Sequence, residues 1–91
     1  MGTTDRLTTY VFTTTDIVYG KQPILRVIHE EDGDWQVLGG ENCPTIEKAM
    51  LVSLDEIFQI DKSLQDIVPH LHRGREAIRF SSDSQWIIKD E

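Results

Sequence analysis

The sequence has few of the features that mark secreted or membrane proteins. Its 91 residues contain one cysteine, Cys43, which cannot form an internal disulfide, so a reducing, cytoplasmic location is expected. Its longest apolar runs, such as residues 49–52, are far too short to cross a bilayer, so no membrane association is predicted. The N-terminal stretch MGTTDRLTT lacks a basic start followed by an apolar segment, so no secretory signal is expected.

Basic residues are also scarce. Nine Lys and Arg residues stand against sixteen Asp and Glu, which gives a net charge of −7. The stretch from Glu30 to Asp66 holds ten of the carboxylates and only Lys48 and Lys62, so its local charge is −8 and the rest of the chain is nearly neutral. Such a field repels phosphate backbones, and nucleic-acid binding is therefore not predicted. An acidic surface can attract a basic protein, or it can simply keep a small domain soluble, and the composition leaves both open.

Motifs for cofactor chemistry are absent as well. Gly39 and Gly40 are followed by Glu-Asn-Cys-Pro and not by a lysine and a helix, so they form no phosphate-binding loop. The abundant carboxylates have no apolar pocket in view that would raise a pKa toward neutrality for acid-base catalysis. Cys43 has no helix-start or glycine-rich context that would make its thiol reactive. The sequence therefore predicts no catalytic residue and no cofactor.

The pair His70 and His72 is the one candidate for metal binding. On an extended segment both imidazoles would point the same way, with His29 or Cys43 as a third ligand. Nothing in the spacing brings these residues together, so solvent-facing histidines are the favoured interpretation and no metal is predicted. A small enzyme, or a metal- or ligand-binding domain, with its site near Trp35, His70 and His72 remains the alternative function.

Length and pattern predict one α+β domain over residues 1–91, with a mainly antiparallel sheet of four to six strands and a helical segment packed on one face. Residues 7–13 alternate as a strand. The motif Asp-Gly-Asp-Trp lies between strands at 24–30 and 35–39, and Asp32-Gly33 suits a two-residue turn. That turn would set Glu30 opposite Trp35, Ile28 opposite Val37, and Glu31 against Asp34.

The second tryptophan repeats the arrangement. Asp-Ser-Gln-Trp at residues 83–86 follows a strand at 75–80 and precedes a short strand, so the two motifs reuse the same turn chemistry. Gly33, Trp35 and Trp86 are accordingly predicted to be structural, and neither tryptophan is expected to stack on a ligand.

The helical part lies between these two regions. A turn capped by Thr45 leads into a brief buried strand at 50–54, and Ser53 with Glu56 forms a capping box. Apolar residues recur every three or four positions through residues 54–71, which predicts one buried stripe. Asp61 with Ser63 could divide this segment, so one helix or two remains open, and Pro69 ends it.

The order of these elements resembles a known family. A strand ending in Thr-Thr, a hydrophobic strand leading into DGDW, then GGEN, VSLDEI, DKSL and a terminal aromatic strand are together similar to the bacterial immunity-protein-like domains of unknown function. That family's signature is Asp-Ser-Gly-Trp followed by Gly-Asp-Glu, and residues 10–79 carry the resemblance. The family lies near polymorphic toxins, so the resemblance implies a bacterial protein that binds and neutralises a toxin, without catalytic residues.

These observations favour a protein interaction module over an enzyme. The predicted interaction face consists of acidic residues from the hairpin and the segment after it: Glu30, Glu31, Asp32, Asp34, Glu41 and Glu47. A basic, toxin-like protein is the expected partner because opposite charge accelerates association. A homo-oligomer is left open.

Overall fold

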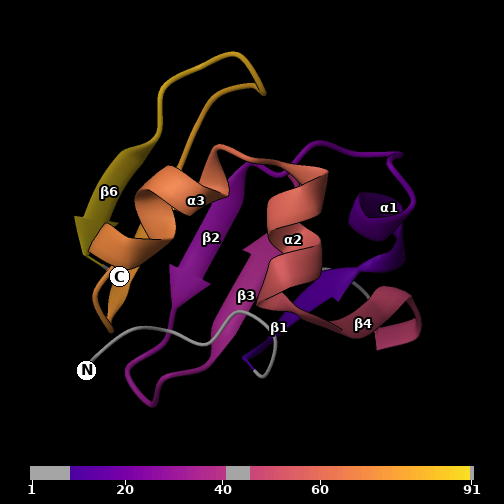
Figure 1. Ribbon diagram of the computed structural model, residues 1–91, viewed down its shortest axis with the longest axis horizontal. Coiled ribbons are helices and arrows are strands. Elements are labelled where there is room, and N and C mark those ends of the chain that lie inside the picture. Colours follow the sequence, from indigo (N-terminus) through magenta and orange to yellow (C-terminus); the bar gives the residue numbers. More distant parts are fainter. Residues whose placement is uncertain (1–8, 41–45, 91) are drawn as a thin grey trace.

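The computed structural model describes residues 9–40 and 46–90 (Figure 1). Six strands and a few short helices make up this part of the chain. In order they are β1 (Tyr10–Thr14), α1 (Thr15–Val18), β2 (Arg26–His29), β3 (Trp35–Leu38), η1 (Ile46–Lys48), β4 (Ala49–Ser53), α2 (Leu54–Ile60), α3 (Leu64–Ile67), η2 (Val68–His70), β5 (Arg75–Ile78) and β6 (Ile87–Asp90). The predicted α+β class is confirmed.

The strands form a single sheet in the order β4-β1-β3-β2-β5-β6. Every neighbouring pair is antiparallel except β1 and β3, which run parallel. The mostly antiparallel sheet was predicted, and the parallel pair was not. The chain leaves β1 through α1 and returns along β2, so the following strand, β3, runs in the direction of β1.

The hairpin between β2 and β3 has a different register from the predicted one. His29 pairs with Trp35 and Val27 with Val37, one position away from the pairing that a two-residue turn would give. The loop has one more residue than predicted, because Glu30 N donates to Asp34 O at 2.8 Å and Gly33 N to Glu30 O at 3.0 Å. Gly33, at φ 99°, takes the left-handed position of a three-residue hairpin loop. Trp35 and Val37 therefore share a face with Val27 and His29, and Ile28 lies on the opposite face.

Strand β4 is an edge strand, not the buried strand that its apolar sequence predicts. It pairs only with β1 in the described sheet. Val52 is buried, whereas Leu51 is 57% exposed because it points to the opposite face. Edge position and alternation together explain why a continuous apolar run is only partly buried.

The helical segment consists of two short α-helices and a final 3-10 turn. Ser53 Oγ accepts from Glu56 N at 3.2 Å and caps α2, which confirms the serine half of the predicted capping box. Asp61 ends α2, and its Oδ1 accepts from Ser63 N at 3.0 Å and from Ser63 Oγ at 2.7 Å. These local bonds compete with helix continuation, which is why the segment divides there. Pro69 lies in η2 after α3 ends.

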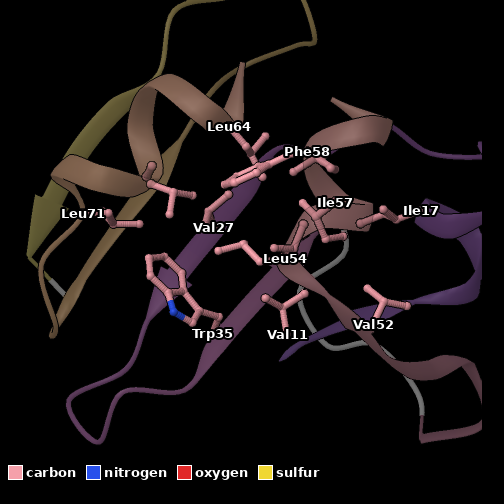
Figure 2. Close-up of a cluster of buried hydrophobic side chains, with 14 residues drawn as sticks. Val11, Ile17, Val27, Trp35, Val52, Leu54, Ile57, Phe58, Leu64 and Leu71 are labelled. Carbon is pink, nitrogen blue, oxygen red and sulfur yellow. The ribbon is translucent and has the colours of Figure 1, made fainter. Parts of the chain in front are cut away.

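The buried cluster joins strands and helices (Figure 2). Its strand members share one face of the sheet by register: Val11, Val27, Trp35, Val37, Val52 and Ala77. Ile57 and Leu64 are fully buried, as the apolar stripe predicts. In Figure 1 the ribbons of α2 and α3 lie in front of the sheet. We call the face that carries Trp35 the inner face and the opposite one the outer face.

Candidate functional site

The tip of the β2–β3 hairpin gathers four of the six predicted interaction residues. Glu30, Glu31, Asp32 and Asp34 line one hollow of about 420 Å³, together with Phe12 and Gln36. We call this the acidic hollow. No basic residue belongs to its lining as the described part of the chain forms it. The hairpin loop curls the acidic residues together because Gly33 reverses the backbone and Asp32 Oδ1 accepts from Asp34 N at 3.0 Å.

The four carboxylates differ in whether they form hydrogen bonds with other residues of the chain. Glu30 Oε2 accepts from Gln36 Nε2 at 2.5 Å, and Asp32 forms the turn just described. The side chains of Glu31 and Asp34 are exposed and make no hydrogen bond or ion pair with any other residue in 9–40 or 46–90. These two carboxylates are therefore free to bind a group from another molecule.

Phe12 is the aromatic residue in the lining of the acidic hollow, and it was not among the predicted interaction residues. It is 50% exposed on the outer face, where it lies opposite Leu51 and next to Gln36. Tyr10 is 57% exposed on the same face of β1 and falls level with Asp34, one step before the Val11–Trp35 pair. Strict alternation along β1 was the available signal, because burying Val11 sends Tyr10 and Phe12 to the outer face.

The hairpin tip rests against the loop before β5. Gly74 N donates to His29 O at 2.7 Å, and Gly74 has φ 81°. A methyl group at Gly74 would collide with the Glu31 carboxylate, and one at Gly33 would come within 3.1 Å of the Arg73 guanidinium. Glycine at these two positions lets the hairpin and the loop approach closely. Arg73 is thus a basic residue beside the acidic tip, on the Gly33 side.

The other two predicted interaction residues lie elsewhere. Glu47 is exposed in η1, just before β4. Ala49 pairs with Thr14 at the end of β1 that is farther from the hairpin tip, so Glu47 lies toward the opposite end of the sheet. Glu41, Cys43 and Thr45 lie outside the described residues. Of the predicted interaction residues that the structure describes, the four at the hairpin tip lie together and Glu47 lies apart from them.

Trp35 and the two histidines of the alternative site differ in exposure. Trp35 is only 4% exposed and stacks on His29, with ring centroids 3.8 Å apart and planes 10° from parallel. His29 Nδ1 donates to Leu71 O at 2.8 Å, which fixes its ring against the tryptophan. His70 and His72 are exposed in and after η2. In residues 9–40 and 46–90 no group of three or more His, Cys, Asp or Glu residues could hold a metal ion.

A second aromatic–acidic cluster lies between α2, α3 and the β5–β6 loop. The Arg79 side chain is 3% exposed; its Nη2 contacts Asp61 Oδ2, and its guanidinium lies 4.3 Å from the centre of the Trp86 ring. Arg79 Nε donates to Ile24 O at 2.9 Å, and Trp86 Nε1 donates to Ser63 Oγ at 3.0 Å. We call this the arginine clamp. Burial alone would raise the pKa of Asp61, but hydrogen bonds from Ser63 and Arg79 outweigh it and hold that pKa below its ordinary value.

A hollow of about 440 Å³ lies beside the arginine clamp, between residues 20–24 and the end of α2. Gln22 and Lys21 belong to its lining, and Gln22 Oε1 is buried without a hydrogen-bond partner among the described residues. The one carboxylate in the described lining of this hollow is that of Asp61, and Arg79 already binds it. This hollow therefore offers an incoming cation far less than the acidic hollow does.

Comparison of the chain with protein-family models, with curated protein sequences and with solved structures found no match. In the described part of the chain no helix is long and apolar enough to cross a membrane.

Proposed function

We propose that this chain is a protein interaction module that binds a basic partner at the acidic hollow. We propose further that the partner is a toxin and that binding neutralises it. The observation that carries the proposal is the assembly of four carboxylates around a half-exposed aromatic ring in one hollow. Phe12 also lies opposite the exposed Leu51 and two positions from the exposed Tyr10, and a contiguous apolar patch bordered by polar residues is typical of an interaction site.

The arrangement of the layers supports the same function. In this proposal the helical segment covers the inner face of the sheet and leaves the hairpin end of the outer face available. Tyr10, Phe12 and Leu51 are each at least half exposed there. A partner that docked on this face would bury apolar surface and meet the free carboxylates of Glu31 and Asp34 at its border.

Affinity capture from a lysate of the native host tests the proposal when it compares three baits. The first is the unmodified chain, and the second is Glu31→Lys with Asp34→Lys. The third is Asp66→Lys with Asp83→Lys, which has the same net charge but alters exposed residues outside the acidic hollow. We expect a basic protein with the first and third baits and its loss with the second. Association should also slow as salt rises, because surface charges are screened beyond about 8–10 Å.

Equal capture by the second and third baits would contradict the acidic hollow as the binding site. Co-expression then tests whether binding neutralises a toxin. A captured partner that is toxic to cells should lose its toxicity when it is co-expressed with the unmodified chain and keep it with the Glu31→Lys, Asp34→Lys variant.

A further inference from the structure

The acidic hollow and the residues beside it indicate which positively charged side chain the partner supplies. We infer that the docking surface receives an arginine side chain flanked by apolar side chains, with the guanidinium stacked on Phe12 and bound by carboxylates of the acidic hollow, Asp34 among them. This inference rests on the proposed function and identifies the partner segment by its chemistry. Three observations carry it.

The first observation is that the acidic hollow contains an exposed aromatic residue. Phe12 is 50% exposed and lines the hollow together with the four acidic residues. A guanidinium is planar, stacks on aromatic faces and donates in a fork that matches carboxylate oxygens, whereas a lysine ammonium is a compact, strongly hydrated point charge. An exposed aromatic ring in the same hollow as carboxylates therefore favours arginine over lysine.

The second observation is that the same chain already holds an arginine in this way. In the arginine clamp the Arg79 guanidinium lies over Trp86 while Asp61 binds it from the side. Its remaining donors reach Ile24 O and Ser63 Oγ. The acidic hollow presents the corresponding aromatic ring and carboxylates without the guanidinium.

The third observation is the apolar surface next to Phe12. Leu51 lies directly opposite Phe12 on β4, and Tyr10 lies two positions before it on β1, so all three point to the outer face. Side chains two positions apart on a strand are about 7 Å apart, close to the spacing of alternate side chains in an extended partner segment. The apolar side chains of the partner would cover Tyr10 and Leu51 while its arginine enters the acidic hollow.

A pair of blocked peptides provides the test on the intact chain. The probes are acetyl-Ala-Leu-Arg-Leu-Ala-amide and its lysine counterpart, titrated into ¹⁵N-labelled protein and followed by NMR amide shifts. We expect the largest shifts at Phe12 and residues 30–36, and a dissociation constant about 5-fold lower for the arginine peptide. Phe12→Ala should reduce that ratio to about 1 while leaving charge-dependent binding of both peptides. The matched control is Phe80→Ala, since Phe80 is 94% exposed outside the hollow and its loss should leave the ratio unchanged.

The outcomes separate this inference from the proposed function. Equal binding of both peptides at residues 30–36 would overturn the arginine inference and leave the basic-partner function standing. Arginine-selective binding that survives Phe12→Ala would also overturn it, because the ring would then play no part. Arginine-selective, Phe12-dependent binding alongside capture that ignores Glu31→Lys with Asp34→Lys would show that the acidic hollow selects arginine while the captured partner binds elsewhere, which would overturn the proposed function. If the protein self-associates as its concentration rises and Phe12→Ala abolishes this, the docking surface binds a second copy of the chain and not a basic segment. That result would overturn the inference.

Discussion

The arginine clamp and the acidic hollow contain the same kinds of groups in opposite states. At the clamp, the chain supplies the guanidinium that lies between Trp86 and Asp61, and only 3% of the Arg79 side chain remains exposed. At the hollow, Phe12 is half exposed, the side chains of Glu31 and Asp34 are exposed, and no basic residue belongs to the described lining. The charged groups of the clamp are paired within the fold, whereas Glu31 and Asp34 make no internal bond in the described chain and, in the proposed function, bind another molecule.

The largest effect should come from removing the internal guanidinium. Arg79→Met leaves the Asp61 carboxylate, which is 23% exposed, without its main cationic partner. We expect the free energy of unfolding to fall by about 2 to 4 kcal/mol, below the full cost of breaking a wholly buried pair because water reaches Asp61. Urea denaturation followed by circular dichroism measures this loss. The double variant Arg79→Met with Asp61→Leu should recover part of it, and no recovery would show that the arginine acts mainly through its other contacts.

Removal of the aromatic part of the clamp should have a smaller effect. Trp86 is only partly buried, but it stacks on Arg79 and donates to Ser63 Oγ. Trp86→Ala should lower the free energy of unfolding by about 1 to 2 kcal/mol. The same denaturation experiment on Phe12→Ala provides the comparison: loss of a half-exposed ring from the hollow should cost no more than about 1 kcal/mol. Equal costs for the two variants would mean that the hollow, like the clamp, is mainly structural.

Acid should affect the clamp in a defined pH range. Because the pKa of Asp61 is lower in the folded chain than its ordinary value of 3.8, protonation favours the unfolded state. The stability contributed by this carboxylate is present above pH 3.8 and is lost as the pH falls through the lower folded value. Thermal denaturation across pH 2 to 6 should show this loss in the unmodified chain and a shallower loss in Asp61→Asn. Parallel curves for the two proteins would contradict the role assigned to Asp61.

The smallest effect on stability should come from the acidic hollow. The side chains of Glu31 and Asp34 make no internal bond in the described chain, so Glu31→Lys with Asp34→Lys should change the free energy of unfolding by no more than about 0.5 kcal/mol. Binding of a basic partner should fall strongly in the same variant. A stability loss comparable to that of Arg79→Met would remove the contrast between the two clusters.

Local patterns predicted much of the fold. The Ser53 cap and the burial of Ile57 and Leu64 follow from short-range rules that the structure satisfies. The sequence left open whether the helical segment divides at Asp61, and the structure divides it there. The exact pairing of the hairpin was wrong because Asp32-Gly33 also suits a longer loop in which Gly33 alone takes the left-handed conformation. Because the loop is one residue longer than predicted, Ile28 and Trp35 lie on opposite faces of the sheet, whereas the predicted pairing placed them on the same face.

The candidate site was only partly visible in the sequence. The acidic residues of the hairpin are neighbours in the chain, so their clustering could be predicted from local sequence. Phe12 reaches them only because β1 pairs with β3 in parallel, and Arg79 reaches Trp86 and Asp61 only through tertiary packing. A charge pattern along one segment carries no information about which distant strand will lie beside it.

The parallel pairing of β1 and β3 also bears on when the docking surface forms during folding. The β2–β3 hairpin closes a short loop, so the acidic tip can form early. Strand β1 instead joins two strands that follow it much later in the chain, which requires the closure of long loops. We therefore expect Tyr10 and Phe12 to reach the acidic tip late in folding. A chain that had formed only the β2–β3 hairpin would then present the carboxylates without Phe12 beside them, and binding competence would mark the pairing of β1 with β3.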